Sequence, residues 1–226
     1  MITVHHLANS RSQRILWLLE ELGVDYVIKR YERDTETGLA PPELEKLHPL
    51  GKAPIVTDDD ITLAESGAII EYLVDKFDDG SLRPAKGTAA GRAYTYWLHY
   101  AEGSFAPLMV MSLIMTRIET APVPFFLKPV TRSIAAKVRD GYLDPTIEKN
   151  LAMMEDSLAG NDWFCGDSLS AADIQMSFAV EAAEARVGTG TFPGIAGYLE
   201  RMRARPAFQA AIEKGGPYAL LGAASK

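Results

Sequence analysis

The chain has little of what marks secreted, membrane-spanning or redox-active proteins. Its 226 residues include a single cysteine, Cys165, which excludes an internal disulfide framework and fits a reducing cytoplasm. No apolar run approaches the roughly 18 residues of a membrane-spanning helix. Strand-like sequence begins directly at the N-terminus, where a signal peptide would stand in a secreted protein. We therefore expect a cytoplasmic protein that does not cross a membrane.

Basic residues are also in short supply. The chain carries 23 Lys and Arg against 30 Asp and Glu, a net charge of −7. The acidic excess lies in residues 1–80, with 8 basic and 16 acidic residues, whereas residues 81–226 hold 15 and 14. Because no basic patch is available to neutralise phosphates, nucleic acid is not an expected partner. An anionic ligand would depend on a few placed cations, for which Arg11, Arg14 and Lys52 are the candidates.

The first part of the chain alternates strand and helix patterns. The predicted elements are, in order, a strand over 2–7, a helix over about 15–22, a strand over 26–31, a short helix over 41–47, two short strands and a helix over about 65–77. Gly23 is placed to close the first helix. This order is that of a thioredoxin-like fold, with a parallel first half and an antiparallel second half.

Helical patterns fill the rest of the chain. An apolar stripe from Tyr94 to Ser112 predicts one long helix, and a break follows at residues 121–124. A second long helix is expected over about 127–158, with a kink at Pro145.

A turn-rich linker separates the two kinds of pattern. We expect a thioredoxin-like α/β domain over 1–79, a linker over 80–88 and an all-helical domain over 89–226. Within the latter, Ser170 and Asp173 have the spacing of a capping box, with Asp in place of Glu or Gln. Because capping explains both residues, we expect Asp173 to be structural and not catalytic.

The most informative segment runs from Gly51 to Ser66. Three aspartates between two short apolar strands predict a hairpin. Pro54 cannot donate to a strand ladder and belongs at the start of its strand, so the backbone of Ala53 is free to pair with something else. Glu65 and Ser66 stand at a helix start, where unpaired N–H groups and the helix dipole favour a carboxylate. Together these features predict a peptide-binding site. The alternative is an ordinary hairpin with a helix N-cap at Ser66.

This segment resembles the glutathione transferase family. The likeness lies in Leu47-His48-Pro49-Leu50-Gly51-Lys52-Ala53-Pro54 and in Ala64-Glu65-Ser66-Gly67-Ala68-Ile69. With the box at Ser170, it covers essentially the whole chain. Residues 10–23 most resemble the bacterial and fungal GTT-type subgroup. The resemblance implies a thioredoxin-like domain followed by an all-helical domain, and glutathione as co-substrate.

The family resemblance assigns the glutathione site. It implies that Ala53, before a cis Pro54, pairs with the backbone of the glutathione cysteine, and that Glu65 and Ser66 hold the γ-glutamyl end. Lys52 is the natural partner for the glycine carboxylate, although it could also be a solvated loop lysine. Two further residues, His48 and Arg11, could assist it.

The loop before the first helix should supply the group that stabilises the glutathione thiolate. Ser10 lies four residues before Arg14, as the catalytic serine does in serine-type members, so Ser10 is the first candidate. Asn9 could donate an amide N–H instead, and Ser12 more plausibly belongs to the helix start. Ser10 could also serve only as the helix N-cap. No cysteine lies in this loop, which argues against glutaredoxin chemistry and cysteine-type transferases.

The electrophile is expected between the domains. Phe105, Met109, Ser112 and Phe125 are the candidates, although a Met/Phe stripe at helical spacing equally suits a core. Cys165 is expected to be a packed residue and not a nucleophile. The histidines lack metal-ligand spacing, so no metal is expected.

The function indicated is the conjugation of glutathione to hydrophobic electrophiles, as in detoxification. A glutathione-dependent peroxidase, dehalogenase or isomerase stays open, because a fold and a binding site do not fix the reaction. A non-enzymatic binding protein is the third alternative. The family and the uneven charge also suggest a homodimer with unlike domains facing each other.

Overall fold

A four-stranded mixed sheet forms the base of the molecule. The computed structural model describes residues 1–216 and 218. The strands are β1 (Ile2–Leu7), β2 (Tyr26–Tyr31), β3 (Ile55–Asp58) and β4 (Ile61–Ala64), in the spatial order β2-β1-β3-β4. β1 runs parallel to β2 and antiparallel to β3, which forms a hairpin with β4. This is the thioredoxin-like arrangement expected from the sequence.

Both faces of β1 are covered, which is why its residues are almost all buried. On one face Val4 belongs to the main core with side chains of α1 (Ser12–Leu22) and α2 (Ser66–Phe77). On the other face Leu7 packs with Leu44 of the short 3₁₀ helix η1 (Pro42–Lys46). Alternate residues of a strand point to opposite faces, so one strand serves both cores.

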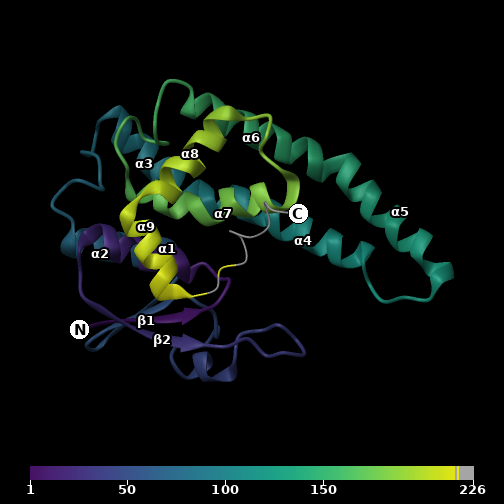
Figure 1. Cartoon of the computed structure of the whole chain (residues 1–226), viewed down its shortest axis with the longest axis horizontal. Helices are drawn as coiled ribbons and strands as arrows, with labels where there is room; N and C mark the ends of the chain where they lie inside the picture. Colours follow the sequence, from purple (N-terminus) through teal and green to yellow (C-terminus); the bar gives the residue numbers. More distant parts are fainter. Residues whose placement is uncertain (217, 219–226) are drawn as a thin grey trace.

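Helices cover the sheet in a second layer (Figure 1). The C-terminal helices are α3 (Ala89–Tyr100), α4 (Ala106–Glu119), α5 (Lys128–Val138), α6 (Asp144–Leu158), α7 (Ala171–Val187), α8 (Pro193–Ala204) and α9 (Pro206–Gly215). α7 packs against both α1 and α2, and α9 packs along α1. Trp17 of α1 meets Phe208 of α9 edge to face, with 5.3 Å between ring centroids. The helical part thus rests directly on the α/β part.

Each long helix is interrupted by a π-helical segment just before a proline. The segment η2 (Ala101–Phe105) separates α3 from α4, and η4 (Arg139–Leu143) separates α5 from α6. Pro107 and Pro145 follow these segments; proline has no N–H for the carbonyl four residues earlier, and its ring crowds that carbonyl. The kink expected at Pro145 therefore takes the form of a widened turn. The same device at Pro107 was not foreseen.

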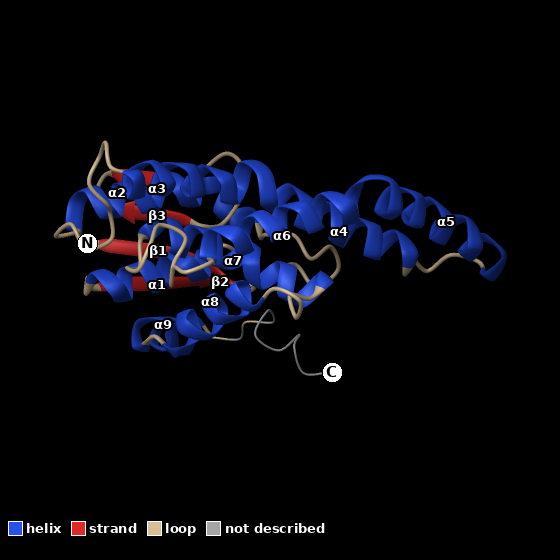
Figure 2. Cartoon of the chain, turned by 90° about the horizontal axis from the view of Figure 1, so that it is seen from above, coloured by secondary structure: helices blue, strands red, loops and turns tan. Residues whose placement is uncertain are grey.

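The hairpin of α4 and α5 extends beyond the rest of the molecule (Figures 1 and 2). Its turn contains the 3₁₀ helix η3 (Phe125–Leu127), and several large apolar side chains near it are exposed, including Phe125 at 83% and Phe126 at 63%. Within residues 1–216 and 218, no helix has both the length and the apolar character needed to cross a bilayer.

The expected capping box at the start of α7 is confirmed. The fully buried Asp173 carboxylate accepts hydrogen bonds from the N–H of Ser170 at 2.8 Å, its hydroxyl at 2.6 Å, and the N–H of Phe164 at 2.7 Å. Burial nevertheless raises the pKa of Asp173 to about 6. All its contacts are within the fold, in agreement with a structural role.

A second buried carboxylate, Glu181 of α7, binds the segment that follows α9. The Tyr218 hydroxyl donates to Glu181 Oε2 at 2.8 Å, and Arg203 of α8 stands 4.0 Å from Oε1. Arg203 itself is paired with Glu184. Burial outweighs these partners and raises the pKa of Glu181 from 4.5 to about 7.

We predict that Glu181 makes the protein less stable as the pH rises. A carboxyl whose folded pKa exceeds its unfolded value stabilises fully below the unfolded pKa, here 4.5, and this contribution is lost as the pH rises through about 7. Relative to wild type, Glu181→Gln should gain on the order of 3 kcal/mol in unfolding free energy between about pH 5 and pH 8. Urea unfolding of both proteins measures this. Glu184→Gln is the control, and parallel pH profiles for wild type and Glu181→Gln would contradict the prediction.

Candidate functional site

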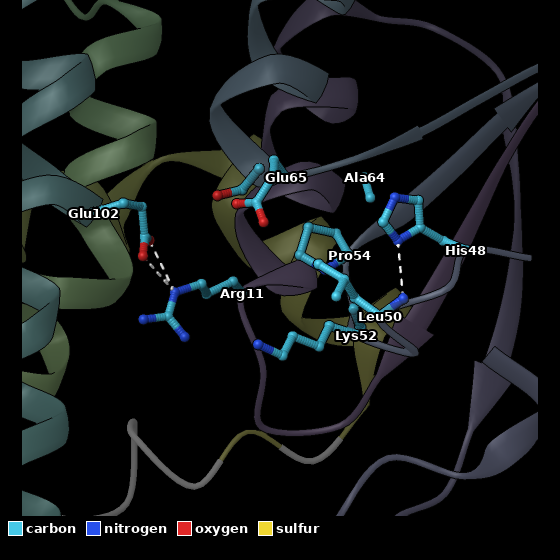
Figure 3. A pocket seen from close by; sticks show the side chains of 10 residues that line it. Arg11, His48, Leu50, Lys52, Pro54, Ala64, Glu65 and Glu102 are labelled. Carbon is cyan, nitrogen blue, oxygen red and sulfur yellow. Dashed lines mark hydrogen bonds and ion pairs between the residues drawn. The ribbon is translucent and has the colours of Figure 1, made fainter. Parts of the chain in front are cut away.

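A groove of about 250 Å³ opens where the first helix, the β3–β4 hairpin and the helical part meet (Figure 3). All seven residues expected to bind glutathione line it: Arg11, His48, Lys52, Ala53, Pro54, Glu65 and Ser66. Leu50, Ala64 and Glu102 complete the wall. The structure thus brings together residues chosen from separate motifs.

The backbone on one side of the groove is shaped by the turn before β3. The Ala53–Pro54 peptide bond is cis, as the resemblance implied. Gly51 has φ +55°, and a Cβ there would lie 2.7 Å from Cγ of Glu45, so this position requires glycine. Among the described residues, Ala53 makes no backbone hydrogen bond. Its N–H and C=O are available to an extended ligand beside β3.

The start of α2 forms another side of the groove. Glu65 has φ +70°, a conformation that costs a non-glycine residue about 1–3 kcal/mol and that often occurs at functional sites. Its carboxylate is exposed, and Figure 3 shows it directed into the groove. Ser66, which is buried, begins α2 beside it, where the first N–H groups of a helix lack internal partners.

Charge at the groove centres on Glu102, which the sequence analysis missed. Both of its oxygens accept from Nε of Arg11 at 2.9 Å, and Oε1 also pairs with the fully buried Arg14. Burial opposes ionisation, but the two guanidiniums hold the pKa of Glu102 below its usual value. Arg14 also donates to the carbonyl of Gln175 in α7. The sequence did offer one indication of Glu102, because it is the only charged residue in 101–116.

The candidate thiolate donor Ser10 is buried and is not among the residues that line the groove. Its hydroxyl accepts from the N–H of Ser12 at 3.2 Å and shares a hydrogen bond with the Ser12 hydroxyl at 2.8 Å. The Ser12 hydroxyl in turn lies 2.8 Å from Nδ1 of His6. Burial lowers the pKa of His6 to about 4, so this chain ends on a neutral ring at pH 7.

The loop position of Asn9 is set by its backbone. Asn9 has φ +54°, which asparagine tolerates better than most residues. Its carbonyl accepts from Arg33 Nη2 at 3.2 Å, and Nε of the same guanidinium reaches the carbonyl of Ala8 at 3.3 Å. Arg33 therefore clamps the loop. No local pattern in the sequence indicates this contact across 24 residues.

The residues expected to contact the electrophile lie outside the groove described above. Phe105, Met109 and Ser112 are almost wholly buried in the core, because the stripe they share faces α7 and its neighbours. Phe125 is exposed at the far end of the α4–α5 hairpin. The adjacent face of α4 instead forms an apolar groove of about 330 Å³ with Ala106, Pro107, Val110, Met111 and Ile114.

Cys165 and the histidines offer no further chemistry. Burial raises the pKa of the half-buried Cys165 thiol to about 12, so it is a poor nucleophile at neutral pH. His5 lies between the Tyr31 hydroxyl at 2.9 Å and the Thr57 hydroxyl at 3.3 Å. Residues 1–216 and 218 contain no cluster of His, Cys, Asp or Glu able to hold a metal ion.

Comparison with known proteins agrees with this architecture. Residues 1–75 match the model of the glutathione S-transferase N-terminal domain, and residues 114–206 match that of the C-terminal domain. Glutathione S-transferase 3 of Schizosaccharomyces pombe is 38% identical over 95% of this chain and 88% of its own length. Glutathione S-transferase 1 of Saccharomyces cerevisiae is 32% identical over 95% of both chains.

A solved structure shows the same arrangement. The glutathione S-transferase of Actinobacillus pleuropneumoniae is 36% identical, with a TM-score of 0.79 over 98% of this chain and 96% of the other. The chain therefore belongs to the glutathione S-transferase family.

We predict that Glu102 is the main electrostatic link between the two parts. Glu102→Ala leaves Arg14 buried without a carboxylate and should lower the unfolding free energy by about 3 kcal/mol. Glu119 stands at the C-terminal end of the same long helix, and Glu119→Ala, which removes a partner from the less buried Arg139 of η4, should cost less than about 1 kcal/mol. Chemical denaturation measures both. Equal losses in the two variants would show that the Glu102 pair is an ordinary surface contact.

Proposed function

We propose that this protein conjugates the thiolate of glutathione to hydrophobic electrophiles. The supporting observation is a polar groove with a free backbone edge next to an apolar groove, the two sharing Arg11 and Glu102. A peptide fits the first and an apolar molecule the second. Two solved transferases, each 24% identical to this chain, hold related ligands: one from Phanerochaete chrysosporium binds oxidised glutathione, and one from a sphingomonad binds glutathione.

Each part of glutathione has a counterpart in the first groove. The Ala53 backbone pairs with the cysteine residue of the tripeptide, and Glu65 with the start of α2 holds the γ-glutamyl end. The Glu65 carboxylate complements the ammonium group, while the N–H groups at the start of α2 complement the carboxylate. Lys52, which is exposed and makes no ion pair with any described residue, receives the glycine carboxylate. His48 lies at the edge of this region (Figure 3).

Catalysis then consists of holding the thiolate and placing it against the second substrate. A free thiol has a pKa of about 8.5, so depressing it by two units is worth roughly 2.7 kcal/mol. The Ser10 hydroxyl can donate to sulfur while the Ser12 hydroxyl donates to Ser10. We place this chemistry in the cytoplasm, with detoxification as its role.

The direct test is an assay panel with glutathione and chlorodinitrobenzene, organic hydroperoxides, haloalkanes and glutathione disulfides. We expect the protein to turn over the aryl and alkyl halides. Turnover confined to hydroperoxides or disulfides would replace conjugation by the redox alternatives. Glutathione binding without any turnover would favour a binding protein.

Ser10→Ala should lower the rate of conjugation ten-fold or more, which corresponds to about 1.4 kcal/mol of transition-state stabilisation. The affinity for glutathione should change less, because the peptide contacts lie elsewhere. Steady-state kinetics and calorimetry measure the two effects. Unchanged turnover in Ser10→Ala, with a loss in Asn9→Ala, would transfer the role to Asn9.

Glu65→Ala and Ser66→Ala should mainly weaken glutathione binding. They affect the γ-glutamyl end, remote from sulfur, so the ground state and the transition state lose the same contacts. A rise in KM for glutathione of about ten-fold with a small change in kcat is the expected pattern. Glu71→Ala, on α2 but outside the groove, is the control. Wild-type affinity in both groove variants would remove this helix start from the site.

We further propose a homodimer. Several large apolar side chains between α3 and α6 are exposed, among them Tyr96, Val130, Ile134 and Tyr142, and an interface would cover such side chains. The acidic residues 1–80 and the nearly neutral remainder suit a pairing of unlike domains. Sedimentation at micromolar concentration should give about twice 24.7 kDa. An active monomer would reject the dimer and leave the transferase proposal intact.

A further inference from the structure

Two grooves meet at a single point of the molecule. The glutathione groove and the apolar groove of α4 have only Arg11 and Glu102 in common. A bond between a molecule in one groove and a molecule in the other must therefore form beside these two side chains. Charge that develops during that step therefore interacts most strongly with Arg11 and Glu102.

Of the two, Arg11 is the one with hydrogen-bond donors left open. The Glu102 oxygens already accept from Nε of Arg11 and from Arg14. Within the described part of the chain, the two Nη atoms of Arg11 donate to no protein group. Figure 3 shows both on the side of the guanidinium that faces away from Glu102. The guanidinium is held in place from both sides, because its Cζ also lies 5.2 Å from the ring centroid of Phe178.

The charge balance at this junction favours an anion. Two guanidiniums share one carboxylate, so one positive charge is in excess at a place where the Arg11 side chain is only 32% exposed. The rest of the apolar groove consists of Ala, Pro, Val, Met and Ile side chains. With Glu102 ionised, its lining holds no group that would protonate a departing alkoxide.

We infer that Arg11 is a catalytic residue for the electrophile, beyond its place in the glutathione site. The thiolate lone pair forms the carbon–sulfur bond, the bond from carbon to the leaving group breaks, and its electron pair departs with that group. The Nη donors of Arg11 stabilise this anion. The thiol proton has already gone to solvent.

Among the electrophiles of the proposed function, such a donor favours those whose leaving group departs as a stable anion. Benzyl halides are therefore suitable probes, because their apolar body suits the groove of α4 and their halide leaves with the electron pair. Hydroperoxides fit poorly, because their alkoxide product needs a proton. This inference rests on the proposed function.

The test compares Arg11→Gln and Arg11→Lys with wild type on para-nitrobenzyl chloride, bromide and iodide at saturating glutathione. Arg92→Gln, an exposed arginine of α3 remote from both grooves, is the control. Arg11→Gln should lower kcat about ten-fold or more for the chloride and only about three-fold for the iodide, since the smaller anion has the more concentrated charge. Arg11→Lys should fall between, and the ultraviolet absorbance of the bound thiolate should titrate as in wild type.

An equal loss for all three halides, with a matching rise in KM for glutathione or a lost thiolate signal, would overturn the inference by making Arg11 a glutathione contact only. Faster wild-type turnover of cumene hydroperoxide than of any halide would overturn the substrate class. If Arg11→Gln proves unfolded by circular dichroism, the halide dependence of Arg11→Lys decides alone. If the wild-type protein binds glutathione but turns over no halide, the inference about Arg11 is wrong. If it binds no glutathione, the proposed function itself is wrong.

Discussion

One carboxylate with two guanidiniums governs the arrangement of this protein. Glu102 lies in the π segment η2 of the helical part. It forms ion pairs with Arg11 and Arg14, which lie 91 and 88 residues earlier in the chain. Arg14 is fully buried, and a buried cation is tolerable only with its charge compensated and its N–H groups bound. Glu102 thereby compensates the buried charge at the start of α1, while Glu21 near the end of α1 pairs with Arg205 between α8 and α9. Because Glu102 also lines the groove, the same ion pairs contribute to the packing of α1 and to the wall of the binding site.

The groove itself is built mainly from backbone. An unpaired edge at Ala53, a left-handed residue at Glu65 and a left-handed glycine at Gly51 create its shape. Side chains contribute charge at the rim and an apolar surface along α4. Such a division suits an enzyme that must bind one constant substrate and several variable ones, since backbone contacts are fixed and an aliphatic face adapts.

The sequence predicted the parts whose causes are local. Pro54, the aspartate turn and the Glu65-Ser66 helix start act within a few residues, so the hairpin and its side of the groove could be read directly. The widened turn before Pro145 was predicted as a kink for the same reason, although the identical signal at Pro107 was overlooked. Gly23 ends α1 in the left-handed conformation, as expected.

Long-range and face-dependent features were beyond the sequence. Nothing near Arg11 shows that Glu102 will pair with it, and nothing near Asn9 shows that Arg33 will clamp its loop. The apolar stripe over 94–112 was correct as a core, and the three members that were also assigned to the electrophile, Phe105, Met109 and Ser112, are packed in that core. The groove uses the next face along, where Ala106, Val110 and Ile114 recur every four residues. The sequence alone does not distinguish two apolar faces of one helix, because it does not show which face packs against a neighbouring helix.

The single thiol of the chain has a chemical consequence for an enzyme of this class. Burial raises the pKa of Cys165 to about 12 and so keeps this thiol protonated at neutral pH. While the protein stays folded, Cys165 is therefore a poor target for reagents that alkylate sulfur. Unfolding would return the thiol to its ordinary pKa of about 8.5, so alkylation of Cys165 would mark loss of the native state.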